Sequence, residues 1–380
     1  MSRFLVLTWD GAGNTVPFQA VVEGLQLRGH DVAVWSHASN LDAFSRLGAR
    51  TTAFPTAAPY DARDRFGADE SDHARWVLSN VIANAAMAED ALTAIEVEQP
   101  DAVVVDDLLL FAHAAVQSSG LRAAALAHVP IANRTARERR NTLLAFALDR
   151  LNAHRESLGL RDVRTVLDAI ESTGPFIAAT APTFDPPSPE SPAVQVGPVR
   201  PSLRGEAAPD EPEEPLVIVA LSSGWMHQVV LLQRILHALE PLEVAVWVTL
   251  GPSVRAEELR QTRNSRLFGS LPHERVLPMA SLLVTHAGHG TIMAGLAAGV
   301  PMLCMPLGRD QPTNAARAAE LGAADVLDAS SSTGHIRAAA SALLDDLTRR
   351  VRCEQLAASV RAETRLDLAT STLERLVAAP

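Results

Sequence analysis

Short apolar runs alternate with longer segments rich in Ala and Leu along the chain, and this alternation limits the possible folds more than any other feature. It predicts strands over 4–8 and 31–36 and helices over 17–28 and 41–47. The run over 102–105 is apolar without alternation, which is typical of a strand that is covered on both faces. Strands that alternate with helices form a parallel sheet, so we predict an α/β fold.

A proline-rich segment divides the chain into two parts. Ten of the 24 prolines lie between Pro182 and Pro215, a composition that favours neither a helix nor a central strand. After this segment the alternation begins again, with strands predicted over 216–221, 244–249 and 281–285 and a helix over 229–239. With 380 residues the chain is long enough for two domains. We predict an N-terminal domain over 1–181, a linker over 182–215 and a C-terminal domain over 216–380.

The charge and composition exclude several classes of protein. Lys and Arg number 33 against 44 Asp and Glu, a net charge of -11, which argues against a nucleic-acid partner. No apolar stretch approaches the ~18 residues of a membrane span, so we expect no membrane insertion and a cytoplasmic protein. Two cysteines are too few for a cysteine-based zinc site or a disulfide framework, and we predict no metal.

A glycine-punctuated turn follows the predicted strand over 281–285. The turn reads His286-Ala-Gly288-His-Gly290-Thr291, and a helix rich in Ala and Leu is predicted to start at Gly290-Thr291. Glycines let the backbone approach a ligand closely, and a helix start provides unpaired N–H groups and the positive end of a dipole. With His286 as a further donor, the turn predicts a site for phosphate or diphosphate, although short glycine patterns also recur by chance.

A second polar cluster follows the strand that Gly299-Val-Pro301 introduces. It contains Asp310 and Gln311. In open parallel sheets ligands bind outside the carboxyl ends of the strands, so these two side chains are placed to bind hydroxyl groups of a molecule attached to the diphosphate. On its own, the Asp-Gln-Pro sequence is more often a helix N-cap turn than a ligand site.

Together these motifs resemble the donor signature of family 1 glycosyltransferases, which have the GT-B fold. The matching residues are His286-x-Gly288-x-Gly290-Thr291, Gly299-Val-Pro301 and Asp310-Gln311-x-x-Asn314. Near the N-terminus, Gly13-x-x-x-Pro17 and Arg28-Gly-His-Asp-Val32 resemble the first strand-helix unit of bacterial natural-product members. The resemblance therefore spans nearly the whole chain.

The resemblance implies two facing Rossmann-like domains with a cleft between them. The N-terminal domain would bind a small-molecule acceptor and the C-terminal domain a nucleotide sugar, and the last helix is a candidate to pack back on the N-terminal domain. The sugar would be transferred with inversion, without a metal or a cofactor, by a monomer or homodimer. In this mapping the following residues bind the donor: Ser222, Ser223, His286, Gly288, Gly290 and Thr291 around the diphosphate, and Asp310 with Gln311 at the sugar.

Two departures from the family concern the nucleotide. Members that use UDP-sugars often carry a glutamate for the ribose hydroxyls eight residues after the signature histidine, where this chain has Ala294. The tryptophan that stacks on uracil is also missing, because the corresponding segment reads Ser270-Leu-Pro-His273. A deoxyribose has no 2′-hydroxyl to bind. We therefore favour a dTDP-sugar over a UDP-sugar as donor.

A further departure concerns catalysis. Many members carry a histidine base where this chain has Asn14, which does not accept a proton at neutral pH. Asp106 matches the aspartate that usually accompanies this histidine, and Asp10, on the same loop as Asn14, is our candidate for the base. Alternatively the acceptor is acidic enough to need no base and Asn14 orients it. His37, His73, His113 and His128 are other candidates that the spacing does not separate.

The acceptor region should lie between Ala53 and Arg164 and include Phe54–Tyr60, Trp76 and Asn133–Arg137. Two other functions compete with transfer. Gly11-x-Gly13 resembles a dinucleotide fingerprint only weakly, because Val16 stands where the third glycine would be. A non-catalytic protein that binds sugar nucleotides would explain the loss of the histidine base.

Overall fold

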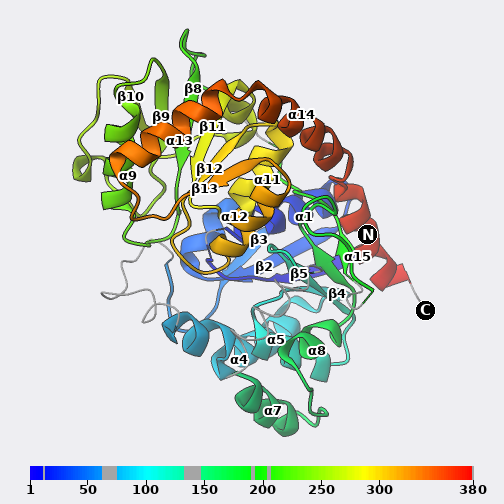
Figure 1. The fold of residues 1–380 in the computed structure, drawn as a ribbon. Helices are drawn as coiled ribbons and strands as arrows, with labels where there is room; N and C mark the ends of the chain where they lie inside the picture. The colour runs from blue at the N-terminus through cyan, green and yellow to red at the C-terminus, as the bar shows by residue number, and fades with distance from the viewer. Residues whose placement is uncertain (12, 62–74, 132–146, 190–192, 203–206, 379–380) are drawn as a thin grey trace. The chain divides into compact units, whose positions relative to one another are not determined.

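The computed structural model of the chain describes residues 1–11, 13–61, 75–131, 147–189, 193–202 and 207–378. The chain forms two compact units, each built around its own parallel sheet (Figure 1). The first unit comprises Met1–Asp61, Phe66–Ser202 and Thr364–Pro380. The second unit comprises Ala62–Arg65 and Leu203–Glu363.

The sheet of the first unit has the strand order β3-β2-β1-β4-β5-β6-β7, with every neighbouring pair parallel. Every residue of β4 and β5 is buried, as expected for central strands covered on both faces. From β1 the chain adds β2 and β3 on one side of β1, and then crosses over to add β4 on its other side. This reversal of direction creates a topological switch point between β1 and β4. The strands are β1 (Arg3–Leu7), β2 (Asp31–Ser36), β3 (Arg50–Ala53), β4 (Ala102–Asp106), β5 (Ala123–Ala127), β6 (Phe176–Ala178) and β7 (Val194–Gln195).

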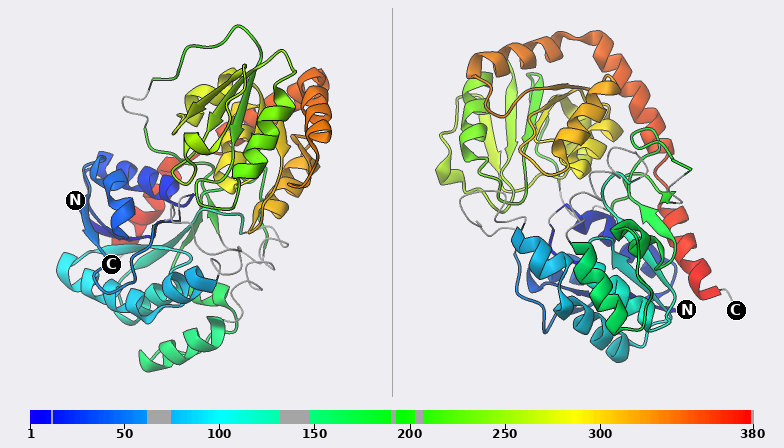
Figure 2. Two further views of the ribbon diagram at one scale, coloured as in Figure 1. Left: turned by 90° about the vertical axis from the view of Figure 1, so that its left-hand side faces the viewer. Right: turned by 60° about the horizontal axis from the view of Figure 1, so that its bottom comes forward.

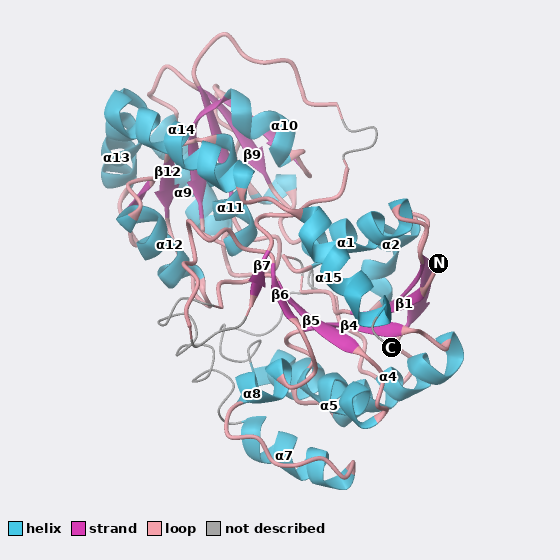
Figure 3. Cartoon of the chain, turned by 90° about the vertical axis from the view of Figure 1, so that its right-hand side faces the viewer, coloured by secondary structure: helices cyan, strands magenta, loops and turns pink. Residues whose placement is uncertain are grey.

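Helices cover both faces of this sheet. Figure 3 shows α1 and α15 on one face and α4 and α5 on the other. A capping box at Thr165 and Asp168 fixes the start of the short helix α8. The helices of the first unit are α1 (Thr15–Leu27), α2 (Leu41–Ser45), α4 (Ala85–Glu98), α5 (Leu110–Ser118), α7 (Leu148–Ser157), α8 (Val166–Glu171) and α15 (Leu366–Ala378).

The last helix, α15, packs against α1 (Figure 2). Gly24 in the middle of α1 allows this close approach, because a Cβ atom there would lie 2.8 Å from Cγ2 of Thr370. Leu373 is fully buried in the same apolar cluster as the strands of the first sheet. At the outer edge of the contact, Glu374 pairs with Arg28 at 2.7 Å and with His30 at 3.0 Å. Helix α15 is thus part of the core of the first unit.

The second unit repeats the architecture with six parallel strands in the order β10-β9-β8-β11-β12-β13. Its switch point lies between β8 and β11. The strands are β8 (Leu216–Ala220), β9 (Ala245–Thr249), β10 (Ser265–Phe268), β11 (Ala280–Thr285), β12 (Met302–Cys304) and β13 (Ala324–Val326). The helices are α9 (Val229–Leu239), α10 (His273–Val276), α11 (His289–Ala298), α12 (Gln311–Glu320), α13 (Thr333–Asp345) and α14 (Leu347–Ala362).

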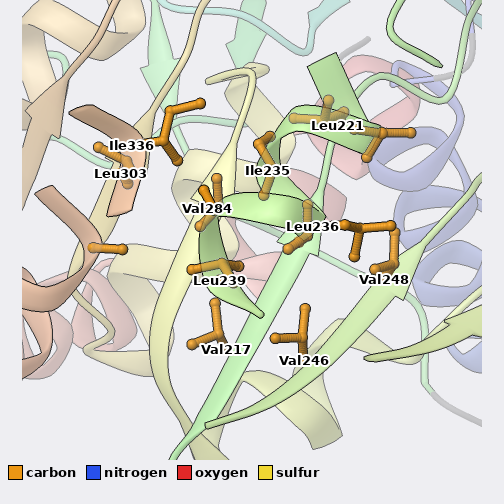
Figure 4. Packing of buried hydrophobic residues seen from close by; sticks show 14 of the residues in the cluster. Val217, Leu221, Ile235, Leu236, Leu239, Val246, Val248, Val284, Leu303 and Ile336 are labelled. Atoms are coloured by element: carbon orange, nitrogen blue, oxygen red, sulfur yellow. The ribbon is translucent and has the colours of Figure 1, made fainter. Parts of the chain in front are cut away.

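One core of this unit lies where α9 and α13 cover the sheet (Figure 4). Ile235, Leu236 and Leu239 of α9 meet valines of β8 and β9, and all these side chains are buried. The packing of α9 on β8 and β9 therefore explains both the apolar spacing of the helix and the uninterrupted valines of the strands. This core fixes the strand ends from which the loops described below emerge.

The structure confirms the predicted α/β class and the two Rossmann-like parallel sheets of the GT-B fold. The predicted strands and helices lie within one or two residues of the observed ones, as for α9, which has the predicted bounds. The proline-rich segment contributes β7 to the edge of the first sheet, and the first unit extends to Ser202. Among the described helices, none combines the length and the apolar character needed to cross a membrane.

Candidate active site

Polar loops follow the adjacent strands β8, β11 and β12 at the carboxyl edge of the second sheet. These loops and the first turns of the helices that follow them contain all eight residues that the sequence predicts to bind a donor. The loop after β8 carries Ser222 and Ser223, the loop after β11 carries His286, and the loop after β12 carries Asp310. Ligands of open parallel sheets bind at this edge beside the switch point, so the three loops form one candidate site.

The turn between β11 and α11 depends on a glycine. Gly288 is the N-cap of α11, which begins at His289, one residue before the start predicted from the sequence. A Cβ atom on Gly288 would lie only 2.5 Å from Nε2 of His286, so the missing side chain makes room for the imidazole ring. Gly290 is exposed, and a Cβ atom there would meet nothing within 4 Å. Thr291 lies in the first turn and donates its backbone N–H to the Gly288 carbonyl at 3.0 Å.

His286 is 7% exposed, and its Nδ1 atom has no hydrogen-bond partner within the described part of the chain. Burial lowers the pKa of His286 to about 4, the nearby charge of Asp310 and a hydrogen bond to the Ala220 backbone act in the opposite direction, and Arg309 lowers the pKa further. The ring is therefore neutral at pH 7, with one nitrogen that donates and one that accepts. In the tautomer that carries its proton on Nδ1, this atom can donate to an anionic oxygen beside the start of α11.

The loop between β8 and α9 is held by a residue that the sequence analysis missed. Gln228 is fully buried, and its Nε2 donates to the carbonyls of Ser222 (3.1 Å) and Gly224 (3.2 Å) and to Oγ of Ser253 (3.1 Å). Its Oε1 accepts the backbone N–H of Met226 at 2.7 Å. Ser222 is buried while Ser223 is exposed. No sequence pattern marks Gln228, because its partners are backbone atoms of an irregular loop and the hydroxyl of the distant Ser253.

The loop between β12 and α12 is fixed by two amide side chains. Gln311 is 2% exposed; its Oε1 accepts the N–H groups of Leu307 (2.8 Å) and Gly308 (3.2 Å), and its Nε2 lies 3.1 Å from Sδ of Met226. Asn314 donates to Oδ2 of Asp310 at 2.6 Å and to the Ala287 carbonyl at 3.1 Å. Asp310, half-buried, is thus oriented toward the His286 turn, whereas the amide of Gln311 is used within the protein.

In the first unit, Asn14 and Asp106 meet at the switch point between β1 and β4. Nδ2 of Asn14 donates to Oδ2 of Asp106 at 2.7 Å, and Oδ1 of Asp106 accepts the backbone N–H of Leu108 at 3.1 Å. Both side chains are fully buried. Asn14 also donates to the Trp9 carbonyl at 2.9 Å and accepts the Gly11 N–H at 3.0 Å. Its amide is occupied within the protein, and Asn14 ties together the two residues on either side of Asp10.

Asp10 is half-buried, and its backbone N–H donates to Nδ1 of His37 at 3.4 Å. Of the other histidine candidates, His113 is buried and bonds to Thr173 (2.9 Å) and to the Asp106 carbonyl (3.1 Å), which indicates a structural role. His73 lies outside the described residues, as do Asn133–Arg137 of the expected acceptor region.

His128 lies near two aspartates. Its Nδ1 is 3.9 Å from Oδ1 of Asp107, and ligand atoms of Asp106, Asp107 and His128 lie within 4.8 Å of one another. A divalent cation needs carboxylate lone pairs that are directed toward it. Because Asp106 uses both oxygens in hydrogen bonds to Asn14, Thr8 and Leu108, we assign no metal to this group.

The chain has the GT-B fold, and the curated proteins to which it is similar include named glycosyltransferases. Within it, residues 233–374 match the family model described as the C-terminal domain of erythromycin biosynthesis protein CIII-like proteins. This match covers the predicted donor residues from His286 to Gln311. The sequence resemblance to bacterial natural-product glycosyltransferases is confirmed.

Curated relatives span the whole chain at low identity. The 4'-demethylrebeccamycin synthase of Lentzea aerocolonigenes is 24% identical over 99% of this chain and 100% of its own length. The demethyllactenocin mycarosyltransferase of Streptomyces fradiae is 26% identical over 86% of this chain and 76% of its own length. Because these relatives are named transferases or synthases, the matches do not favour the non-catalytic alternative.

Solved structures agree in fold. The glycosyltransferase of kitacinnamycin has a TM-score of 0.83 at 23% identity and covers 99% of this chain and 98% of its own. The glycosyltransferase VinC, solved in complex with dTDP, has a TM-score of 0.75 at 21% identity, with 99% of both chains covered. The spinosyn rhamnosyltransferase SpnG, solved with spinosyn aglycone, has a TM-score of 0.72 at 20% identity, with 98% of this chain and 100% of its own covered.

Proposed function

We propose that the protein transfers a sugar, with inversion, from a nucleotide diphosphate sugar to a small-molecule acceptor of specialised metabolism. The observation that carries this proposal is the turn before α11, where the buried Nδ1 of His286 has no partner in the described chain beside a helix start. The diphosphate would accept hydrogen bonds from His286 and from the helix start, lined by Gly288, Gly290 and Thr291. Ser222 and Ser223 would bound the same phosphates, and Asp310 would bind sugar hydroxyls.

Gln311 has a different part in this proposal from the one that the sequence predicts. Its amide already bonds to the loop over 307–308 and contacts Met226 of the neighbouring loop. Contact of Gln311 with a sugar would therefore require its present bonds to exchange. In the arrangement described, the residue supports the sugar site by joining the loops after β8 and β12.

The donor that we favour carries a deoxyribose, as in a dTDP-sugar. Ala294, where UDP-using members have a glutamate, is buried and offers no polar group to a 2′-hydroxyl. The segment that corresponds to the base-stacking tryptophan contains Ser270 and His273, and neither side chain provides an indole ring to stack on uracil. The dTDP complex of VinC supports the same choice by analogy. We assign donor binding to the C-terminal domain and acceptor binding to the N-terminal domain, as the family resemblance implies; SpnG, which has a similar fold, was solved with an aglycone.

For the chemical step we propose Asp10 as the general base, in a mechanism that needs no metal. Asp10 would take the proton of the acceptor hydroxyl while the oxygen attacks the anomeric carbon in line with the leaving diphosphate. Asn14 and Asp106 would act as positioning residues, because Asn14 bonds to both Trp9 and Gly11 around Asp10. His286 and the start of α11 would stabilise the charge that develops on the leaving group.

Calorimetric titration with dTDP, UDP and NAD tests the donor assignment without knowledge of the acceptor. We expect dTDP to bind about tenfold more tightly than UDP, NAD not to bind, and His286→Ala to weaken dTDP binding about tenfold or more. Tighter binding of UDP would remove the dTDP preference and leave the fold-based assignment intact. Failure of both pyrimidine nucleotides to bind would overturn the proposed function.

The role of Asp10 is tested separately. Asp10→Asn should lower kcat by about 10²-fold or more and leave the Kd for dTDP unchanged, because general-base catalysis acts only on the acceptor proton. Asp42→Asn, which alters an exposed carboxylate on α2 in the same unit, is the matched control and should have wild-type kcat. A normal rate in Asp10→Asn would exclude Asp10 as the base.

A further inference from the structure

Strained backbone is concentrated in the loops after β8, β11 and β12. Among the described residues, four other than glycine have a positive φ, a conformation that is uncommon for residues with a side chain. Three of them are in these loops: His227 after β8 (54°), Ala287 after β11 (66°) and Arg309 after β12 (58°). The fourth, Gln99, ends α4 in the left-handed conformation that commonly caps a helix. Strained residues that cap no helix cluster at ligand sites, so each of the three needs an explanation.

Arg309 is the one of these three that packing explains least. Ala287 is fully buried, and its carbonyl accepts a hydrogen bond from Asn314 at 3.1 Å. The ring of His227 contacts that of Trp225, with centroids 5.1 Å apart. Arg309 is exposed, so burial in the core does not require a side chain at this position, and glycine would adopt the same φ without strain. A function of the guanidinium group itself would account for an arginine here.

Arg309 lies beside the turn that contains His286. The residue that follows it, Asp310, accepts a hydrogen bond from Asn314 at 2.6 Å, and Asn314 also donates to the Ala287 carbonyl of that turn. Burial is the main influence on the pKa of His286, and the charges of Asp310 and Arg309 act on this pKa in opposite directions. The loop after β12 therefore brings one anion and one cation to the predicted diphosphate site.

The charge balance of this site favours a cation. A nucleotide diphosphate sugar carries two negative charges, and Asp310 adds another next to them. His286 is neutral at pH 7, because burial lowers its pKa to about 4, and the start of α11 contributes only a partial positive charge. A guanidinium group is charged at any ordinary pH, and its planar set of N–H groups matches a pair of phosphate oxygens. Arg309 therefore has the charge and the shape that the other residues of the site lack.

We propose that the guanidinium group of Arg309 binds the diphosphate of the donor and offsets the negative charge of Asp310 beside it. Arg309 would thus be a further donor-binding residue, adjacent to the residue that we assign to the sugar hydroxyls. Its contribution would grow during transfer, because negative charge develops on the leaving diphosphate. This inference rests on the proposed function, because the diphosphate is that of the nucleotide sugar.

Calorimetric titration with dTDP at several NaCl concentrations tests the charge of Arg309. Arg309→Gln should weaken dTDP binding about tenfold and make it less sensitive to salt, because one cation no longer meets the phosphates. Arg309→Lys keeps the charge and loses the paired N–H groups, so its loss of affinity should be smaller. Arg260→Gln is the matched control. Arg260 is exposed and lies beside α9, where its backbone N–H donates to Gln233 at 2.6 Å, so this variant should bind dTDP like the wild-type protein.

Arg309→Gly separates a role in binding from a role in the shape of the loop. Glycine relieves the strain of the positive φ, so the midpoint of urea unfolding should rise, while dTDP binding should weaken about tenfold as in Arg309→Gln. Gln99→Gly, at the exposed left-handed residue of the first unit, should raise the midpoint and leave dTDP binding unchanged. Wild-type dTDP affinity in both Arg309→Gln and Arg309→Gly, or a loss no larger than that of Arg260→Gln, would overturn the proposal.

Inorganic pyrophosphate, titrated into the same samples, distinguishes this proposal from the proposed function. Binding of pyrophosphate that depends on Arg309, without binding of dTDP, would support the anion site and remove the nucleotide sugar. Equal binding of dTDP by the wild-type protein and Arg309→Gln would keep the nucleotide sugar and remove Arg309 from its site. Failure of the wild-type protein to bind either compound would overturn both.

Discussion

At the scale of single residues, Asn14 shows how an amide can take the place of a histidine base and keep the contact with the aspartate partner. The family that the sequence resembles often has a histidine at this position, and its partner Asp106 is present here. The contact between them, 2.7 Å from amide to carboxylate, is that of a buried pair with one charge. Sequence motifs alone predict that these two residues matter. They do not reveal that the amide of Asn14 is fully occupied, because that depends on the path of the loop over 8–14.

Asn14→Asp would place two carboxylates in this buried contact. One of them must then take up a proton, so its pKa rises above the ordinary value of ~3.9. We expect the free energy of unfolding at pH 7 to fall by about 3 kcal/mol or more. An acid whose pKa is raised in the folded state costs least stability at low pH, so the deficit should shrink as the pH falls from 7 toward 4. Urea unfolding across this range measures both effects.

The double variant Asn14→Asp with Asp106→Asn is the control for that prediction. It restores one amide and one carboxylate in exchanged positions and should recover part of the lost stability at pH 7. Full recovery is not expected, because Oδ2 of an aspartate at position 14 would face the Trp9 carbonyl, which now accepts a hydrogen bond at 2.9 Å. If the single and double variants were equally unstable, the like-charge explanation would be wrong.

At the scale of elements, strands could be predicted from the sequence closely because their buried faces leave an uninterrupted apolar run, as in β2 and β8. The start of α11 could not be placed as well. Two glycines compete for the N-cap, and only the packing of the His286 ring against Gly288 decides between them. The role of Gln311 was likewise hidden, because its partners lie on the preceding loop and on the loop after β8.

Alanine at these two glycines should have opposite effects on stability. Gly288→Ala places a methyl group 2.5 Å from Nε2 of His286, so the ring must move; we expect lower stability and dTDP binding weaker by about tenfold or more. Gly290→Ala meets no protein atom within 4 Å and replaces an exposed glycine in a helix, so unfolding free energy should stay the same or rise by up to ~1 kcal/mol. Because the added methyl would intrude on the proposed diphosphate site, dTDP binding should weaken here too.

Thermal unfolding with and without dTDP distinguishes these outcomes. Reduced stability in Gly288→Ala alone, with weaker nucleotide binding in both variants, agrees with the packing and with the proposed site. Wild-type dTDP affinity in Gly290→Ala would place the nucleotide away from the start of α11.

At the scale of the whole molecule, the two units are not consecutive in sequence, since Thr364–Pro380 belongs to the first unit. The family resemblance made the last helix a candidate to pack on the N-terminal domain. Gly24 is the residue that permits this contact, yet within α1 it resembles any helical glycine. A contact between residues more than 340 apart leaves no local pattern in the sequence.

Leu373→Ala tests this assignment. Leu373 is fully buried, so we expect the first unit to lose about 2–5 kcal/mol of stability. Hydrogen exchange should accelerate in peptides from α1 and stay unchanged in β8 and β11, with dTDP affinity preserved. Leu347→Ala, at a leucine that is 73% exposed, is the control and should change neither quantity. Faster exchange in the second unit instead would contradict the assignment of α15.

The position of α15 also bears on how the chain folds while it is being made. Phe18, Val21 and Leu25 of α1 belong to the cluster that Leu373 completes. During translation, α1 leaves the ribosome early, but its packing partner follows only after residues 203–363 have been synthesised. The second unit, which needs no later segment, can therefore be finished while the first is still incomplete. The order of completion on the ribosome is thus the reverse of the order in which the two sheets begin along the chain.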